Sequence, residues 1–381
     1  MPGKGTDMII RTTKYFSDGK SYEKKDIAIN GDKISCIGQM QNPDVDLSGL
    51  LVMPGFIDIH VHGGNGSDVM DTTYEAINAI SLYKIQEGVT SFCPTTVTAR
   101  TNKTYAAIEA VNEAVSRGVG GARILGMFLE GPYINPKFKG AHPEEYIRDI
   151  SMDEINELLD KGRGNINSIA IAPEMPNAVD VIKELSGDIK VRLGHSGAAY
   201  EETITGIKAG GSIAIHTYNA MSPFSHRIPG MIGAVLENDE IYNEIICDFI
   251  HTHPATVKLL YKAKGPDKTI IITDCIQAGG MPDGNYELGE LTVVVKDGIA
   301  RTETGALAGS TLTMLNAVRN MHQKLGIPLA EAVKMATATP AKAMGVFDRT
   351  GDIAEGKLAD IIALDEELNL KFVMVGGKRQ V

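Results

Sequence analysis

The chain has 381 residues, of which 43% are hydrophobic and 22% are charged, a composition that suits one large barrel with an appended module. The 37 Lys and Arg residues and the 48 Asp and Glu residues give a formal net charge of -11. This balance argues against nucleic-acid or membrane partners, although a local Arg or His cluster can still bind a phosphorylated small molecule.

The four cysteines, Cys36, Cys93, Cys247 and Cys275, are far apart and form no CxxC pair. A disulfide framework or a thiolate zinc site is therefore not expected. We find no apolar run long enough for a signal peptide and no segment with the roughly 20 apolar residues of a membrane span. These observations predict a cytoplasmic protein with free thiols.

Both ends of the chain have the pattern of short β-strands. Near the N-terminus, DIAINGDKISCIG places Asn30 and Gly31 between two alternating runs, which predicts a tight hairpin. Near the C-terminus, KLADIIALD and LKFVMVGGKRQV are β-rich and are separated by a polar turn. We expect the two ends, residues 1–54 and 348–381, to form one small discontinuous β-sandwich domain.

Between these ends, in residues 55–347, short apolar runs alternate with amphipathic helical patterns. Ser151 and Glu154 form a capping-box signature, and Gly162 and Gly210 stand where helices should end. Eight β/α units predict a TIM-like (β/α)₈ barrel, and a doubly wound sheet is less favoured because no GxGxxG turn follows a strand. The eight expected strands are 56–60, 89–93, 123–129, 168–172, 190–194, 212–216, 244–248 and 269–273.

Two segments interrupt this repeat. Residues 132–150 form a long polar loop after the third strand, and residues 279–305 contain a hairpin that turns at Asp297 and Gly298. Long loops in a compact barrel usually cover or line a binding site. We therefore expect a lid loop at 132–150 and a β-hairpin insertion at 279–305.

The ends of the expected strands carry residues that bind metals. Because all eight strands of such a barrel end at the same rim, these side chains should lie together. In chain order they are His60 and His62, Glu130, His195, His216, Asp248 and His251, and Asp274.

His60 and His62 are two positions apart on an extended segment, so both imidazoles point the same way and can bind one metal ion. An HxH pair alone is weak evidence, but later strand ends add two more histidines and carboxylates. Glu130 could be a helix cap, yet the Gly-Pro that follows it ends the strand, which favours a metal ligand that could bridge two ions. Imidazole and carboxylate ligands suit Zn, Fe or another divalent metal.

Asp274 and Arg227 each have two possible roles. Asp274 follows the apolar run 270–273 and is either a helix cap or a general base that deprotonates an activated water and then protonates the leaving amine. Arg227 is either an ordinary surface charge or a fork for a phosphate group.

The motif PGFIDIHVHG, followed by His195, His216 and Asp274 on later strands, resembles the amidohydrolase superfamily. The segments LEGPYINPKFKGAH, LGHSGA, HTYNAMSPFSHR, TDC and LAGSTLTM narrow the resemblance to its N-acetylglucosamine-6-phosphate deacetylase family. The resemblance spans nearly the whole chain, and GDIAEGKLADIIALD in the closing β segment is typical of the superfamily.

The resemblance implies hydrolysis of the N-acetyl group of N-acetyl-D-glucosamine 6-phosphate to D-glucosamine 6-phosphate and acetate, in amino-sugar catabolism and cell-wall recycling. It implies a divalent metal, Zn or Fe, with Glu130, His195 and His216 as core ligands. His60 and His62 match a pair that is present in members with two ions and replaced in members with one. Asp274 matches the catalytic acid/base, which acts on a water activated by the metal.

The resemblance also implies substrate contacts. Ala141 and His142 match lid positions that contact the sugar and the acetyl carbonyl, and His142 would stabilise the developing oxyanion. Some phosphate contacts in this family come from a neighbouring subunit, which implies a homodimer. The other matched positions are Asn219, Ala220, Arg227, Asp248, Phe249, Ile250, His251, Leu307, Ala308 and Gly309.

This sequence departs from the family pattern at three positions. The family often has Gly where Phe249 stands, Phe where Tyr218 stands and Ala where Cys275 stands. Cys275 lies beside the expected base and could make the enzyme sensitive to oxidation. Phe249 could reshape the pocket and so bears on which sugar is bound.

Three alternative functions stay open. The first is deacetylation of N-acetylgalactosamine 6-phosphate. The second is a cyclic-amide hydrolase of the dihydroorotase type, which usually has a carboxylated Lys on strand four, where residues 168–172 offer no Lys. The third is a non-catalytic barrel, which is disfavoured because such a scaffold would lose the metal ligands or Asp274.

Overall fold

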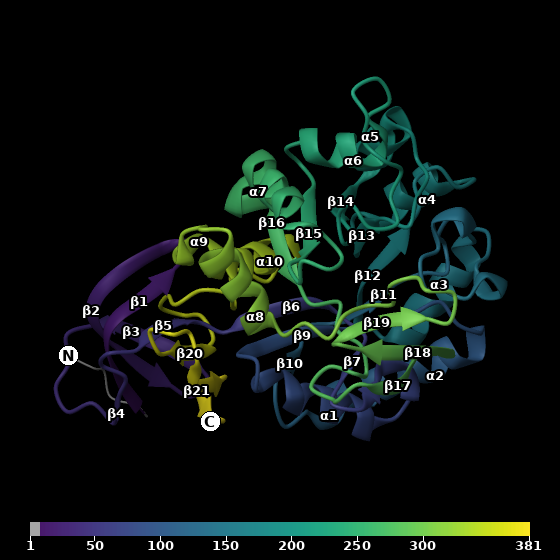
Figure 1. Ribbon diagram of the computed structural model, residues 1–381. Helices are drawn as coiled ribbons and strands as arrows, with labels where there is room; N and C mark the ends of the chain where they lie inside the picture. Colours follow the sequence, from purple (N-terminus) through teal and green to yellow (C-terminus); the bar gives the residue numbers. More distant parts are fainter. Residues whose placement is uncertain (1–7) are drawn as a thin grey trace.

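The computed structural model describes residues 8–381, so residues 1–7 of the expected β-sandwich domain lie outside the described residues. Strands from the two chain ends lie side by side next to a parallel barrel, as the purple and yellow strands of Figure 1 show. The two ends are joined where β5 (Leu51–Pro54) pairs antiparallel with β20 (Ile361–Leu364). The other strands of this eight-stranded sheet are β1 (Met8–Ser17), β2 (Lys20–Asn30), β3 (Lys33–Gly38), β4 (Val45–Asp46), β21 (Leu370–Val375) and β22 (Lys378–Arg379).

The chain-end sheet has a hydrophobic core of its own, and its inner strands also pack on the barrel. Val52 and Ile361 belong to the core of the sheet, whereas the neighbouring Met53 and Ile362 belong to the core of the barrel. Successive side chains of a strand point to opposite faces, so β5 and β20 are buried on both faces. This double burial explains why both strands are apolar throughout.

The predicted N-terminal hairpin is present, with its turn one residue later than expected. Asn30 pairs with Lys33, so Gly31 and Asp32 form the two-residue loop. Gly31 has a φ of 61°, a left-handed conformation that glycine adopts without a steric penalty.

The predicted TIM-like (β/α)₈ barrel is confirmed. Nine parallel strands occupy eight positions around it, because β10 and β11 share the third position. The barrel closes between its first and last strands through a bridge between Val61 and Cys275. The strands are β6 (Phe56–Val61), β9 (Val89–Thr96), β10 (Arg123–Ile124), β11 (Met127–Leu129), β12 (Ile166–Ile171), β13 (Lys190–Leu193), β14 (Gly211–Ala214), β15 (Tyr242–Ile246) and β16 (Thr269–Ile272).

The expectation of one continuous third strand is wrong. The chain breaks between β10 and β11 at Gly126, which has a φ of 135°. The side chain of Asn167 packs against this glycine and would lie 2.5 Å from a Cβ placed there. This close approach from the next strand position requires glycine, and glycine allows the break.

Helices follow most of the strands. Ser151 caps α3 by accepting a hydrogen bond from the Glu154 amide, but the Glu154 carboxylate binds Tyr133 and Arg148, so only half of the predicted capping box forms. The α-helices are α1 (Tyr74–Ile85), α2 (Thr101–Arg117), α3 (Met152–Gly162), α4 (Ala178–Leu185), α5 (Tyr200–Ala209), α6 (Gly230–Glu237), α7 (Pro254–Lys268), α8 (Met314–Arg319), α9 (Leu329–Met335) and α10 (Ala338–Ala343). Within residues 8–381, the helices are too short or too polar to cross a membrane.

The insertion before α8 has three strands rather than the two of the expected hairpin. Strands β18 (Leu291–Lys296) and β19 (Ile299–Thr302) turn at Asp297 and Gly298, as the sequence predicts, and β17 (Gly284–Leu288) pairs with β18. The remaining short elements are β7 (Gly63–Gly64), β8 (Ser67–Asp68), η1 (Val69–Asp71), η2 (Pro136–Phe138), η3 (Glu144–Tyr146) and η4 (Asn320–Lys324).

The chain-end sheet and the barrel are joined by the buried carboxylate of Asp360, which gives a first prediction. Asp360 accepts hydrogen bonds from Arg123 at 2.8 Å, from the Thr350 hydroxyl at 2.8 Å and from the Gly376 amide at 2.8 Å. Asp360→Ala should lower the free energy of unfolding by about 2–4 kcal/mol, because three donors lose their acceptor. Urea unfolding would measure this loss.

The matched control is Glu109→Ala, which removes an exposed ion pair with Arg163 and should cost less than about 1 kcal/mol. Equal losses in the two variants would contradict the assigned role of Asp360.

Candidate metal centre

The histidines and carboxylates from the strand ends meet at the rim of the barrel around Glu130, which follows β11 and is only 2% exposed. Its Oε1 atom lies 3.4 Å from Nε2 of His60, 3.3 Å from Nε2 of His195 and 3.2 Å from Nε2 of His216. These rings come from three different strand positions of the barrel. One buried carboxylate oxygen therefore faces three imidazoles.

The second oxygen of Glu130 faces two further imidazoles. Its Oε2 atom lies 3.1 Å from Nε2 of His62 and 3.5 Å from Nε2 of His142, which belongs to the lid segment 132–150. Asp274 Oδ1 lies 3.2 Å from the same His62 atom. Within residues 8–381, two groups could each hold a metal ion: His60, His62 and Asp274, and Glu130, His195 and His216.

The hydrogen bonds of two rings leave lone pairs directed into this cluster. Nδ1 of His60 lies 3.1 Å from the Glu244 carboxylate, and Nδ1 of His195 lies 2.9 Å from the Phe138 carbonyl. Both partners only accept, so both Nδ1 atoms carry the proton and the Nε2 lone pair remains free for a ligand. Among the described residues, Nε2 of His60 has no hydrogen-bond partner.

A divalent cation fits this donor set. The Nε2 atoms of His195 and His216 are 3.0 Å apart, a separation at which two lone pairs repel unless a proton or a metal ion lies between them. Imidazole nitrogens and carboxylate oxygens are the ligands that Zn and Fe prefer. The residues present therefore match a metal centre.

The electrostatics of the cluster also favour bound positive charge. Burial opposes charge on His62, yet hydrogen bonds with Asp274 and Glu130 raise its pKa to about 9. Burial likewise opposes ionisation of Asp274, but His60 and His62 lower its pKa to about 2. Burial also opposes ionisation of Glu130, but His60 holds its pKa well below its usual value. Asp274 and Glu130 thus stay ionised at neutral pH, and protons or metal ions must neutralise them.

A buried ion pair lies beneath the cluster, and sequence reasoning missed it. Glu244 on β15 accepts hydrogen bonds from His60 Nδ1, from the His216 amide at 3.2 Å and from Arg192 at 2.7 Å. Arg192 is fully buried on β13 and stacks over the Phe128 ring. A charged residue inside each of two apolar strands was the available signal, because such a charge must have a partner.

Asp274 is held from behind by a second buried network. It lies beyond the end of β16 with a φ of 51°, and its amide donates to the His60 carbonyl at 3.0 Å. The hydroxyl of the preceding Thr273 donates to Asp58 at 2.5 Å, and Asp58 also accepts from Lys84 at 3.3 Å. Asp58 and Lys84 were not singled out from the sequence, although both are fully buried.

The backbone is strained around the rim. Non-glycine residues with positive φ follow three strand ends: His195 at 46°, His216 at 26°, Tyr218 at 84°, Ala220 at 50° and Phe249 at 66°. Such conformations cost free energy and cluster at functional sites.

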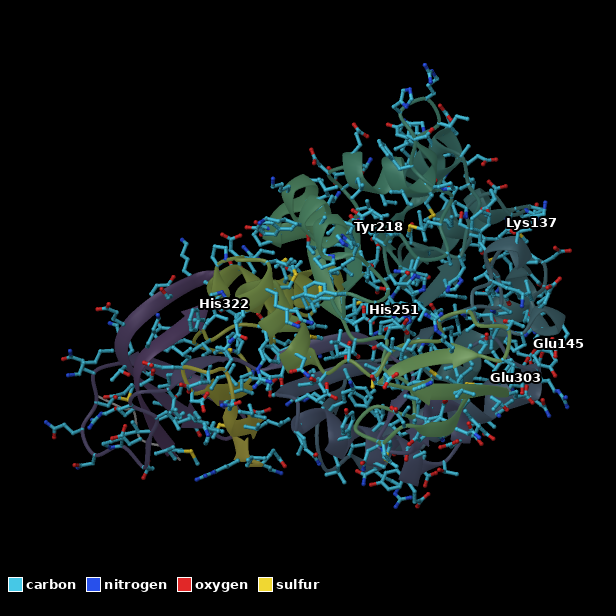
Figure 2. All side chains as sticks on the ribbon, viewed as in Figure 1. Lys137, Glu145, Tyr218, His251, Glu303 and His322 are labelled. Atoms are coloured by element: carbon cyan, nitrogen blue, oxygen red, sulfur yellow. The ribbon has the colours of Figure 1, made fainter. Side chains whose placement is uncertain are left out.

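A cavity of about 210 Å³ opens beside the cluster. Of the predicted substrate contacts, it is lined by Ala141, His142, Asn219, Ala220, His251, Leu307 and Gly309. Asp248 and Ile250 line an adjoining cavity of about 470 Å³, which shares His251, Leu307 and Gly309 with the first. Figure 2 shows Tyr218 and His251 near the middle of the molecule and Lys137, Glu145 and Glu303 at its edge.

Three predicted substrate contacts line neither of these two cavities. Arg227 is exposed on the loop before α6, Ala308 is buried behind its neighbours, and Phe249 packs against the core. Asp248, which lines the adjoining cavity, also orients His251, because its carboxylate accepts a hydrogen bond from His251 Nδ1 at 2.7 Å.

His142 has a defined tautomer. Its Nδ1 atom accepts a hydrogen bond from the Thr98 amide at 3.2 Å and lies 2.8 Å from the Thr98 hydroxyl. Burial, followed by the nearby His195, lowers its pKa to about 4. His142 is therefore neutral at neutral pH and carries its proton on Nε2, on the side of Glu130 and the cavity.

Comparison with known proteins identifies a matching family and three similar proteins. A model of the Amidohydrolase family matches residues 51–380. An N-acetylglucosamine-6-phosphate deacetylase of Vibrio furnissii is 40% identical over 342 residues, which cover 90% of this chain and 86% of the relative. An N-acetylgalactosamine-6-phosphate deacetylase of Escherichia coli O157:H7 is 40% identical over 329 residues, which cover 86% of this chain and 87% of the relative.

Among solved structures, a mutant N-acetyl-D-glucosamine-6-phosphate deacetylase from Mycobacterium smegmatis, in complex with N-acetyl-D-glucosamine-6-phosphate, is similar over its whole length. The TM-score is 0.94 at 30% identity, and the match covers 98% of this chain and 99% of that chain.

The ligand cluster predicts that a divalent metal stabilises the fold. Adding Zn²⁺ to chelator-treated protein should raise the Tm, with a gain of about 2.7 kcal/mol when free zinc is about 100 times its Kd. His195→Ala should lose most of this response, because one of the facing imidazoles is gone. Thermal unfolding at several zinc concentrations would measure it.

The control is His322→Ala, since His322 binds the Ile327 carbonyl and lies apart from the cluster (Figure 2). If zinc stabilised His195→Ala as much as the wild type, the assignment of the cluster would be refuted.

Proposed function

The chain belongs to the amidohydrolase family, and we propose that it hydrolyses N-acetyl-D-glucosamine 6-phosphate to D-glucosamine 6-phosphate and acetate. The observation that carries this proposal is the convergence of four imidazoles and two carboxylates beside an open cavity. Relatives and solved structures with the same named activity support the choice of substrate. The activity would belong to amino-sugar catabolism and cell-wall recycling.

One or two divalent ions, Zn or Fe, would be held at this centre. Glu130, His195 and His216 would bind the first ion, and His60 and His62 would bind a second, with Asp274 beside it. When bound, such an ion polarises the amide carbonyl and lowers the pKa of a water molecule. The presence of both members of the HxH pair supports a site for two ions.

Asp274 is the proposed general base and acid. Its low pKa keeps it ionised, the form that can accept a proton from the attacking water as the water oxygen bonds to the acetyl carbon. As the bond between that carbon and the sugar nitrogen breaks, Asp274 returns the proton to the nitrogen. Acetate and the free amine leave.

His142 is the proposed donor to the oxyanion. The Thr98 amide fixes the proton of His142 on Nε2, on the side of the cavity. This N–H can donate to the acetyl oxygen as negative charge develops on it. Because its pKa is about 4, the ring would keep this tautomer across the neutral range.

The phosphate end of the substrate is proposed to lie at His251, with Asn219 and Ala220 lining the cavity nearby. Asp248 orients His251 by accepting a hydrogen bond from its Nδ1 atom. Leu307 and Gly309 would contact the sugar, and Ala308, Phe249 and Ile250 would support these contacts.

A homodimer is part of this proposal. The loop that carries Arg227 also exposes Phe224, which is 60% accessible, and Ile228, which is 72% accessible. Large exposed apolar side chains side by side are typical of an interface. In a dimer, this loop would bring Arg227 to the phosphate group of the partner's substrate.

The direct test is acetate release from three substrates by the purified protein: N-acetylglucosamine 6-phosphate, N-acetylgalactosamine 6-phosphate and free N-acetylglucosamine. We expect the highest kcat/KM for the first. Preference for the galactosamine epimer would favour the second function, which the Escherichia coli relative supports. No acetate from any of them, with metal bound, would reject the deacetylase.

The role of Asp274 predicts a selective loss of turnover. Asp274→Asn should lower kcat by a factor of roughly 10²–10⁴, because the amide cannot accept or return the proton. Zinc content should stay close to that of the wild type, since the proposed ligands of both ions remain. Turnover near that of the wild type would show that another group is the base.

The role of Arg227 predicts a phosphate-specific effect. Arg227→Ala should raise KM for the phosphorylated sugar and leave kcat/KM for the unphosphorylated sugar unchanged, because only the former offers an anion. Arg163→Ala, which removes an exposed arginine elsewhere, should change neither value. Equal losses on both sugars in Arg227→Ala would contradict the proposed phosphate contact.

A further inference from the structure

The lid segment 132–150 is hydrogen-bonded to both the backbone carbonyl and the ring of His195. The amide of Asn135 donates to the His195 carbonyl at 2.9 Å, and Nδ1 of His195 donates to the Phe138 carbonyl at 2.9 Å. The ring also packs on the lid, since a Cβ at Gly140 would lie 3.3 Å from its Cε1. The orientation and tautomer of this candidate ligand therefore depend on where the lid lies.

A single carboxylate joins the lid to the loop that carries His195. Glu174, which follows β12, accepts from the Asn135 side chain at 2.8 Å, from the Ser196 hydroxyl at 2.7 Å and from the Gly197 amide at 2.6 Å. Asn135 belongs to the lid, whereas Ser196 and Gly197 directly follow His195. Hydrogen bonds to an ionised acceptor are stronger than those between neutral groups.

The contact between the lid and this loop is tight. A Cβ at Gly197 would lie 2.5 Å from the Phe138 ring and 3.4 Å from the side-chain nitrogen of Asn135. The absence of a side chain at Gly197 thus allows the lid to approach closely enough for Phe138 to accept from His195. Glu174 holds the two segments at this distance.

We propose that Glu174 is a positioning residue for the metal centre. By binding Asn135, Ser196 and Gly197 together, it keeps the Phe138 carbonyl on Nδ1 of His195, so that Nε2 faces Glu130. It also holds the near end of the lid, whose far part brings His142 to the cavity. Glu174 itself does not line the 210 Å³ cavity, so it acts through these other groups.

The lid has another carboxylate anchor, which provides a matched control. Glu154 accepts from the Tyr133 hydroxyl at 2.9 Å and from Arg148 at 2.7 Å. This anchor also holds the lid, but none of its partners is next to a candidate metal ligand in the chain. A purely structural role for Glu174 would make the two anchors equivalent.

The experiment compares Glu174→Ala, Glu174→Gln and Glu154→Ala. Zinc affinity of chelator-treated protein is measured by competition with a chromogenic chelator, and lid mobility is measured by hydrogen exchange in residues 132–150. Glu174→Ala should weaken zinc binding by about 10- to 100-fold, the usual effect of losing a group that orients a ligand. It should also speed exchange in the lid and raise KM for the substrate.

Glu174→Gln should restore most of the zinc affinity. Its amide oxygen can still accept from Asn135 and Gly197, and its NH₂ can donate to the Ser196 hydroxyl, which also accepts. Glu154→Ala should speed exchange near α3 but leave zinc affinity unchanged. Loss of Tm without loss of zinc affinity in Glu174→Ala would overturn the proposal.

If Glu174→Ala does not fold, Asn135→Ala removes one arm of the same contact and should still weaken zinc binding, whereas unchanged affinity would overturn the proposal. The KM measurement rests on the proposed deacetylase function, but the measurements of zinc affinity and hydrogen exchange do not. A wild-type protein without deacetylase activity would therefore refute that function and leave the role of Glu174 testable.

Discussion

The structure depends on the burial of one carboxylate, that of Glu130, among five imidazoles. An ionised carboxylate away from water is costly unless positive charge or strong donors surround it. A parallel barrel can meet this need because all its strands end at one rim, so residues from four strand positions, two of them from the first, converge there with one from the lid. The imidazole lone pairs that face Glu130 then favour a bound cation. The buried carboxylate therefore lowers stability when no cation is bound and favours the binding of a metal ion.

Three rings of the cluster have a second hydrogen-bond partner, and these partners come from different parts of the fold. Glu244 holds His60 from below, the Phe138 carbonyl holds His195 from the lid, and Thr98 holds His142 from the end of β9. Glu244, the one carboxylate among these three partners, is buried and has its own counter-charge in Arg192. Strain adds to the cost, since His195, His216 and Asp274 all have positive φ. The site is thus maintained by the fold around it, in keeping with a stability cost that functional sites often carry.

The positions of most strands and of the candidate metal ligands could be predicted from the sequence because both depend on local pattern. Apolar runs mark the strands, and a polar residue at the end of each run must lie at the rim. The supporting residues could not be predicted in this way, since the partners of Arg192, Asp58 and Glu174 lie on elements distant in sequence. The break at Gly126 depends on the side chain of Asn167 across the sheet, and the extra strand β17 depends on pairing with β18. The position of Arg227 at the surface, away from both cavities, likewise follows from tertiary structure alone.

The uneven distribution of charge around the site bears on how an acidic protein could bind an anion. A third cavity, of about 400 Å³, lies between the lid and the β17–β19 sheet, and Glu144, Glu145, Glu290 and Glu303 line it. Figure 2 labels two of these glutamates, Glu145 and Glu303, at the right of the view, away from the more central His251. A phosphate would be repelled from this acidic edge, so the field favours an orientation of the substrate with its phosphate on the side of His251. That orientation places the acetamido group toward His142 and Asp274, which is the arrangement that the proposed reaction requires.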